Sequence, residues 1–214
     1  MAEQLDLLSV PTLTREDGLA RLEALIGADL RPLADQYGIT VWSGGRRNKG
    51  WAGQVVERVL GQAPNSRHGA DFGDWELKVV PLVFTAGGDL RLKETMGLTM
   101  FKAAEIEETD FEDSHLLEKL VRTVVVARVY EDPSEARSLV ATVASFDLDD
   151  PVLYDAIRED YEEIRWVVRA EGVHALSGRI GRWVQPRPKG DAKRAGVGFY
   201  ARKQLVARML GLHL

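Results

Sequence analysis

A short segment, Asp71–Lys78, places two carboxylates and one amine close together in sequence. We expect its end to form a β-strand, in which alternate side chains share a face, so Glu76 and Lys78 point the same way while their neighbours enter a core. Asp71 precedes the strand and can fold back toward Glu76. Two converging carboxylates suit a hard divalent cation such as Mg²⁺, and an adjacent lysine can orient or deprotonate an attacking water. The segment therefore predicts phosphodiester hydrolysis, although ordinary solvated strand faces carry the same pattern.

The residues before this segment predict an amphipathic helix from Lys49 to Gly61. At 100° per residue, Gly50, Gly53 and Gly61 fall on the same side as Glu57. A glycine inside a helix costs roughly 1 kcal/mol relative to alanine, so this grouping predicts that something bulky approaches the helix beside the carboxylate. The approaching group is either a DNA backbone or the neighbouring strand, and in the second case Glu57 is an ordinary surface residue.

Charge is distributed unevenly along the chain, whose overall net charge is −5. The segment from Gly178 to Arg208 carries nine basic residues against one acidic residue, a net charge of +8, which leaves −13 on the rest. Phosphate binding depends on the local field rather than on total charge. Glycines and aromatic residues interrupt the basic run, which favours a loop lying against a duplex over a plain solvated face. An acidic cluster from Glu105 to Glu118 leaves open a surface that docks a protein partner.

The periodicity and punctuation of the sequence predict a mixed α/β protein with one sheet. Thr14 and Asp17 form a loose capping box, and Asp150 with Pro151 starts a long helix that stops at Gly172. We expect helices near 14–27, 33–37, 49–61, 151–172 and 200–210. Strands are expected after residue 71 and near 91–101, 123–130, 139–146 and 180–185, with the valine-rich 123–130 strand central. Turns are expected at 64–69 and 85–89 and a basic loop at 43–48.

Composition excludes several classes of protein. The 214 residues are 45% hydrophobic and 29% charged, which is ordinary for a globular domain. No apolar run reaches the length of a membrane span, and the N-terminus lacks the layout of a signal peptide. The absence of cysteine excludes disulfides and thiolate metal sites. We therefore expect a cytoplasmic protein with no membrane partner.

Three motifs together resemble the MutH family of DNA endonucleases: K-G-W-x-G-Q-x-x-E at Lys49–Glu57, D-F at Asp71, and E-L-K-x-x-P at Glu76–Pro81. This family contains the methyl-directed mismatch-repair nicking enzyme and relatives among GATC-cutting type II restriction enzymes. Weaker matches follow in the same order at 92–95, 113–115, 187–189 and 198–203. The resemblance implies a restriction-endonuclease-like fold over residues 1–214, with a mixed central sheet flanked by helices and two lobes around a DNA cleft. The N-terminal lobe would carry the active site and the C-terminal lobe much of the DNA readout.

The resemblance also implies roles for individual residues. Asp71, Glu76 and Glu57 would hold Mg²⁺, with Mn²⁺ as a substitute, and Lys78 would position the attacking water or neutralise the transition state. These four residues form the predicted catalytic set.

Double-stranded DNA is the implied partner. Arg187 and Lys189 would read guanine in the major groove, and Tyr200 would lie near the adenine whose methylation is sensed, unless it simply packs the last helix. The remaining predicted DNA contacts are Lys49, Arg202 and Lys203, the last two to phosphates.

Departures from the mismatch-repair pattern affect the predicted activity. Asp71 and Glu76 lie closer in sequence than in that enzyme, Gly97 stands where it has an aromatic residue, and Lys93-Glu94 looks more like the restriction relatives. These features favour a type II restriction endonuclease that cuts both strands, as a homodimer on DNA. The alternative is a nicking enzyme acting on the unmethylated strand at GATC, with a mismatch-repair activator protein as partner. A catalytically inactive DNA-binding module is the further alternative.

Overall fold

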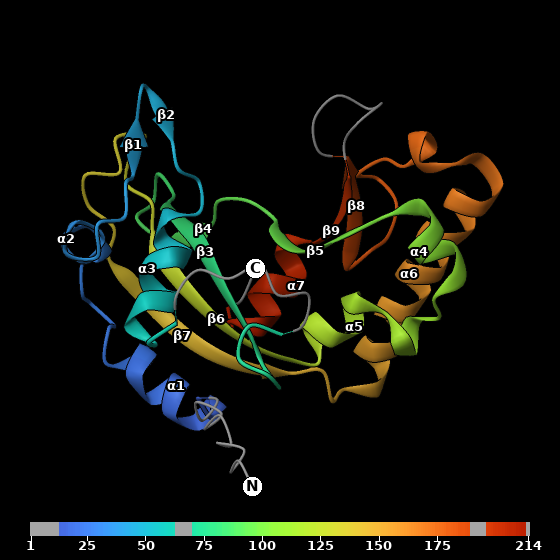
Figure 1. The fold of residues 1–214 in the computed structure, drawn as a ribbon, viewed down its shortest axis with the longest axis horizontal. Coiled ribbons are helices and arrows are strands. Elements are labelled where there is room, and N and C mark those ends of the chain that lie inside the picture. Colours follow the sequence, from blue (N-terminus) through green and yellow to red (C-terminus); the bar gives the residue numbers. More distant parts are fainter. Residues whose placement is uncertain (1–12, 63–69, 189–195, 213–214) are drawn as a thin grey trace, which may run out of the picture.

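The computed structural model of the protein describes residues 13–62, 70–188 and 196–212 (Figure 1). In chain order its helices and strands are α1 Arg15–Glu23, α2 Leu30–Gln36, β1 Trp42–Ser43, β2 Arg46–Arg47, α3 Trp51–Val59, β3 Glu76–Phe84, β4 Leu90–Leu92, β5 Met96–Phe101, α4 Ala103–Glu108, α5 His115–Leu120, β6 Arg122–Val129, β7 Val140–Asp147, α6 Pro151–Glu171, β8 Val184–Pro188, β9 Val197–Ala201 and α7 Lys203–Met209. Two short 3₁₀ turns, η1 Phe111–Asp113 and η2 Val173–Ala175, complete the described elements.

The strands of the described residues form three sheets, so the prediction of one sheet is wrong. The largest sheet has the order β4-β3-β6-β7, with β3 and β6 parallel and the other pairs antiparallel. A second, antiparallel sheet has the order β5-β9-β8, and β1 with β2 forms a small hairpin in place of the expected 43–48 loop. The mixed α/β class and the central place of the valine-rich strand β6 are confirmed.

The expected 91–101 strand is split between two sheets. The β4 part, Leu90–Leu92, pairs with the end of β3 through the predicted hairpin turn at 85–89. The β5 part, Met96–Phe101, leaves that sheet and pairs with β9. Its partner β9 contains Tyr200, which was expected to begin the last helix; α7 begins only at Lys203. Valine and aromatic residues at 197–200 fit a pleated strand better than a helix start, which accounts for the difference.

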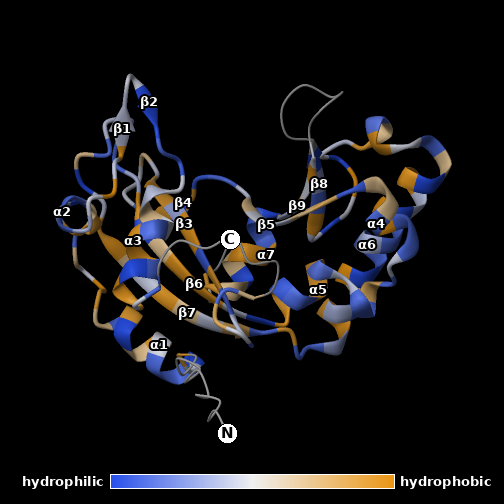
Figure 2. Ribbon diagram, in the orientation of Figure 1, coloured by the Kyte–Doolittle hydropathy of each residue, from blue (hydrophilic) through white to orange (hydrophobic). Residues whose placement is uncertain are grey.

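The core lies on both faces of the four-stranded sheet. Along β6, Val124 and Val126 belong to one buried cluster, and Val125 and Ala127 belong to another. Helices α1, α2 and α3 cover the first face, whereas α5, α6 and α7 contribute to the second cluster. Figure 2 shows the hydrophobic residues concentrated along β3, β6 and the helix surfaces that face them. Strict alternation along β6 is therefore what gives one strand two hydrophobic interfaces.

Local capping signals agree with the observed helix ends. The Thr14 side chain accepts from the Asp17 backbone amide at the start of α1. Asp150 accepts from the backbone amides of the first turn of α6, and Gly172 ends that helix with a φ of +85°. Within the described residues, no helix combines the length and the hydropathy needed to cross a membrane. The expected turn at 64–69 lies outside the described residues.

Candidate active site

The predicted catalytic residues lie where one edge of β3 has no partner strand among the described residues. Strand β6 pairs with Glu76–Leu82 on one side, but β4 reaches only Leu82–Phe84 on the other. The first half of β3 therefore has one edge that no described strand pairs with. A cleft of about 600 Å³ lies against it, and α3, β5 and α5 supply much of the rest of its wall. Glu57, Asp71, Glu76, Lys78 and Lys119 all line this cleft.

A tight turn before β3 brings Asp71 to the strand. The rings of Phe72 and Trp75 stack with their centroids 4.2 Å apart, and both side chains are fully buried. The Phe72 amide donates to the Trp75 carbonyl at 3.1 Å, and Gly73 adopts a φ of +87°, which glycine tolerates without strain. This buried aromatic pair anchors the turn and leaves Asp71, which is partly buried, at the end of the turn that lines the cleft.

Hydrogen bonds then fix Asp71 relative to the strand. Its backbone amide donates to Oε2 of Glu76 at 3.2 Å, and its Oδ2 accepts from the Leu77 amide at 3.3 Å. The expectation that Asp71 folds back toward Glu76 is confirmed. The alternation of β3 is confirmed as well, because Leu77 is buried in the core while Glu76 and Lys78 contact one another.

Two lysines hold the carboxylate of Glu76. This glutamate is only 1% exposed. The Lys78 ammonium donates to Oε1, and the Lys119 ammonium donates to Oε2 at 2.7 Å. Nζ of Lys119 also lies 3.9 Å from Oδ1 of Asp71. Burying a carboxylate is costly unless it is paired and hydrogen-bonded. Lys78 and Lys119 therefore make the burial of Glu76 possible and aim its two oxygens.

Lys119 was not among the residues singled out from the sequence. It lies on α5, forty-three positions beyond Glu76, at the end of the acidic 105–118 segment. A signal was nevertheless present: Leu116, Lys119 and Leu120 are spaced i, i+3, i+4, and all three are the buried residues of that helix. A lysine on the apolar face of a helix indicates a buried partner of opposite charge.

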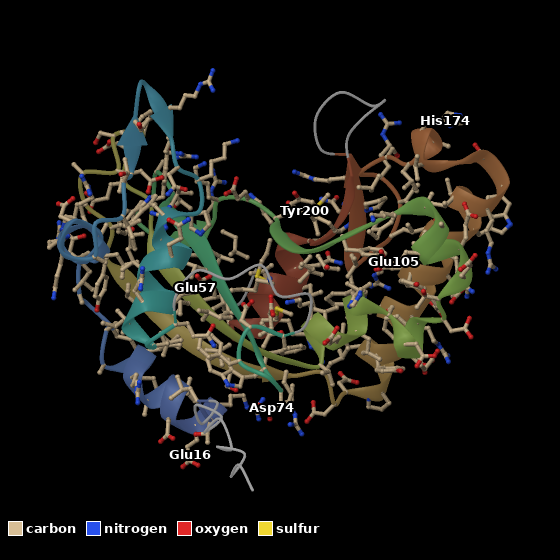
Figure 3. The ribbon with its side chains drawn as sticks, viewed as in Figure 1. Glu16, Glu57, Asp74, Glu105, His174 and Tyr200 are labelled. Carbon is tan, nitrogen blue, oxygen red and sulfur yellow. The ribbon has the colours of Figure 1, made fainter. Side chains whose placement is uncertain are left out.

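The pKa values of the remaining carboxylates show that the acidic groups interact. Burial raises the pKa of Glu57, and the nearby Asp71 and Glu76 carboxylates raise it further, against the lowering effect of Lys78. The pKa of Asp71 is likewise raised by burial and by Glu76, against Lys78, Lys119 and the Leu77 amide. Figure 3 shows Glu57 on α3, and this residue lines the same cleft as Asp71 and Glu76. Glu57 therefore faces the same site as the two residues of the β3 segment.

This donor set fits a hard divalent cation by its chemistry. Asp71 and Glu76 raise the pKa of Glu57, and Glu76 raises the pKa of Asp71, so a cation among these carboxylates would relieve their repulsion. Within the described residues, however, no three acidic or histidine side chains already form a metal cage. Both oxygens of Glu76 accept from lysines instead. The metal site stays a prediction.

The raised pKa of Glu57 predicts how its replacement changes stability. A carboxyl group whose pKa is raised by folding binds its proton more tightly in the folded protein, so its ionisation lowers the free energy of unfolding as pH rises. Glu57→Gln removes this cost. We expect its melting temperature in EDTA to exceed that of wild type at pH 7. The difference should shrink as pH falls through the raised pKa of Glu57 toward the ordinary value of 4.5, below which the carboxyl is protonated in both states.

Thermal unfolding of both proteins between pH 4 and pH 8 checks this expectation. A glutamine variant that is less stable at pH 7, or a difference that does not change with pH, contradicts it.

The residues predicted to contact DNA lie on different elements of the fold. Arg187 on β8 is exposed, and its guanidinium lies 5.6 Å from the ring centroid of Tyr200 on the neighbouring β9. Gly97 pairs with Tyr200 across β5 and β9, and the tyrosine ring lies over it, 3.4 Å from where a Cβ would stand. Lys203 is exposed at the start of α7. Lys189 lies outside the described residues. Figure 3 shows Tyr200 well separated from Glu57, so the structure brings Arg187 to Tyr200 but not to the carboxylates.

Arg202 has an internal role. Its guanidinium donates to the carbonyls of Gly178, Ile180 and Gly181 at 2.8, 3.0 and 2.9 Å, and its amide donates to the Trp183 carbonyl at 2.8 Å. The predicted phosphate contact would therefore compete with bonds that hold the turn before β8.

Asp160 on α6 holds the same turn from the other side. Its buried carboxylate accepts from the backbone amides of Arg182, Trp183 and Val184, the last at 2.7 Å. Asp160→Asn replaces one acceptor oxygen with an NH₂ group that faces these donors, so we expect the free energy of unfolding to fall by about 2–3 kcal/mol. Urea unfolding measures this loss.

Glu159→Gln is the matched control, because Glu159 is exposed on the same helix. An equal loss in the two variants would show that the carboxylate of Asp160 has no special part in the turn.

Comparison with known proteins gives one consistent picture. A family described as "DNA mismatch repair enzyme MutH" matches residues 60–165. A DNA mismatch repair protein MutH from Shewanella sp. (strain W3-18-1) is 30% identical, over 83% of this chain and 78% of its own length. Proteins of the same name from Haemophilus influenzae (strain PittGG) and Vibrio cholerae (strain M66-2) are 28% and 27% identical, over 94% and 92% of this chain and 96% and 95% of their own lengths.

Proposed function

Because this chain belongs to the MutH family, we propose that it is a DNA endonuclease of mismatch repair that nicks the unmethylated strand of hemimethylated GATC sites. The observation that carries the proposal is the buried Glu76 carboxylate held between Lys78 and Lys119, beside Asp71, at the open edge of β3. The names of the relatives favour this reading over the type II restriction enzyme that the departures at Gly97 and Lys93-Glu94 favoured.

The proposed chemistry is hydrolysis of one phosphodiester bond. We assign Asp71 and Glu76 to hold Mg²⁺, with Glu57 completing its surroundings. When bound, the cation would polarise a water molecule and stabilise negative charge on the phosphate.

The residues of the chain supply the rest. The side chain of Lys78 is 18% exposed, so its ammonium reaches the cleft while it contacts Glu76. A positive charge fixed there acts on the charge that develops on the scissile phosphate. The side chain of Lys119 is 9% exposed and holds Oε2 of Glu76, which orients that carboxylate. The complete set of carboxylates and lysines supports a nuclease over a catalytically inactive DNA-binding module.

Partners follow from the same reading. Nicking of one strand needs one active site, so the homodimer on DNA belongs to the restriction alternative, in which both strands are cut. A mismatch-repair activator protein belongs to the nicking reading.

A duplex with one GATC site and a different fluorophore on each strand tests the proposal. We expect cleavage of only the unmethylated strand of a hemimethylated duplex, dependent on Mg²⁺ and absent in EDTA, with the activator protein raising the rate. Cutting of both strands of an unmethylated duplex at equal rates would instead identify a restriction enzyme. Binding without any cleavage, with or without the activator, would identify a DNA-binding module.

A further inference from the structure

A second cavity, of about 230 Å³, lies along the same β3 edge as the cleft. It shares Glu57, Leu77 and Lys78 with the cleft but opens among α3, the β1–β2 hairpin and β6. Its lining contains five cationic side chains and three carboxylates. Two further lysines line this cavity beside Lys78. They are Lys49 and Lys93, and neither takes part in the proposed chemistry. This excess of positive charge, next to the catalytic lysine, suits an anion.

Two of these cations lie over the same aromatic ring, that of Tyr130. Nζ of Lys93 lies 4.4 Å from the ring centroid of Tyr130, and the Arg47 guanidinium lies 5.7 Å from the same centroid. A cation held over an aromatic face keeps its full charge, whereas a cation paired with a carboxylate is neutralised. Arg47 also pairs with the buried Glu135 at 2.9 Å, so Lys93 is the member of this pair that offers its charge to a ligand.

Gly53 on α3 provides an independent indication of a ligand. Gly53 lines the cavity, and a Cβ built on it meets no atom within 4 Å, so packing inside the protein does not require glycine here. Its φ is not positive, so the backbone does not require glycine either. The alternative that the glycines of α3 serve close packing against a strand is wrong for Gly53. A helix glycine that lowers stability without an internal reason indicates an external group that approaches the backbone.

The N-terminus of α3 contributes to the same wall. Gly50 is its N-cap residue and lines the cavity, and no side chain caps this end of the helix. The first amides of a helix have no carbonyl partner within the helix, and they carry partial positive charge. The Gly50 amide donates to Oδ1 of Asn48 at 3.1 Å and the Trp51 amide donates to the Asn48 carbonyl at 3.3 Å. The partial positive charge at this wall therefore comes from the next amides of the first turn, those of Ala52 and Gly53, which line the cavity.

We propose that this cavity binds a phosphate of the DNA backbone that neighbours the scissile phosphate. Lys93 and Lys49 supply charge, and Gly53 lets the sugar-phosphate chain reach the start of α3. This inference rests on the proposed function, because the neighbouring phosphate belongs to the strand whose scissile phosphate lies at Lys78.

The first test is Gly53→Ala, for which stability and DNA binding are expected to change in opposite directions. The methyl group enters open space and favours the helix, so the melting temperature rises. The same group obstructs the DNA backbone, so affinity for a GATC duplex in Ca²⁺ falls about fivefold or more.

Arg58→Ala is the matched control, because Arg58 is exposed on the same helix and lines neither the cleft nor the cavity. The affinity of this variant for the same duplex changes less than twofold. Unchanged or tighter binding by Gly53→Ala overturns the proposal.

The second test locates the phosphate. Duplexes carry one uncharged methylphosphonate each, stepped along the cleaved strand. We expect one position beside the scissile bond to weaken wild-type binding severalfold, while Lys93→Ala binds that duplex and the unmodified duplex equally. Lys93→Arg, which keeps the charge, remains sensitive at that position. Equal sensitivity of Lys93→Ala, or no sensitive neighbouring position, overturns the inference. If wild type neither binds nor cuts the unmodified duplex, the proposed function itself fails.

Discussion

Lys78→Ala is expected to lower the single-turnover rate of DNA cleavage by about a thousandfold, the upper range for removing one charge-stabilising group at a reacting centre. The Lys78 ammonium contacts Glu76 and reaches the cleft, so its loss removes positive charge where the phosphate would react. Duplex affinity should change far less, because a single cation among many phosphate contacts contributes little to binding. Rates at saturating enzyme and affinities in Ca²⁺ separate the two effects.

A surface variant controls for general loss of charge. Arg21→Ala removes one cation from the exposed side of α1, remote from the cleft lining, and should cut at the wild-type rate. Melting temperatures show whether Lys78→Ala remains folded, since Lys119 still pairs with Glu76. Full nuclease activity of a folded Lys78→Ala protein would refute the assignment of this lysine.

Glu135→Ala is expected to cause the largest loss of stability, about 3–5 kcal/mol, because it leaves a buried charge without its partner. Glu135 is 3% exposed and accepts from Arg128 at 2.7 Å, from Arg47 at 2.9 Å and from Nε1 of Trp51 at 2.9 Å. These contacts tie the loop after β6 to the β1–β2 hairpin and to the start of α3. Losing the Glu135 side chain therefore also loosens one wall of the 230 Å³ cavity that Lys93 lines.

Urea unfolding measures this loss against Glu131→Ala. Glu131 lies in the same loop, where it forms an exposed ion pair with Arg137 at 3.6 Å. Exposed pairs contribute little, so the control should lose at most about 1 kcal/mol. Similar losses in the two variants would mean that the buried position of Glu135 gives it no special weight.

Glu135 also has a φ of +51°, which a non-glycine residue adopts only when its surroundings hold it there.

The tertiary structure changed the meaning of several residues that the sequence singled out. Arg202 belongs to the basic run, yet its guanidinium binds three carbonyls of the turn before β8. Tyr200 was placed in a helix and lies on a strand instead, beside Arg187. A basic or aromatic residue in sequence does not reveal whether its side chain faces a ligand or another loop of the same chain, since that depends on which segments fold against it.

The sequence alone determined the local features of this protein. Periodicity predicted α3 and the alternation of β3, capping residues located the start of α6, and the spacing of Asp71, Glu76 and Lys78 indicated the site. These signals are local because they depend on neighbours within a few residues along the chain.

Only the tertiary structure decided the rest. It divided the strands between sheets and left the first half of β3 with one edge unpaired by any strand in the described part of the chain. It also brought Lys119 to Glu76 from forty-three residues away. Such contacts are long-range: they arise when separate elements bury their apolar faces together, and no spacing along the chain encodes which charged groups then meet.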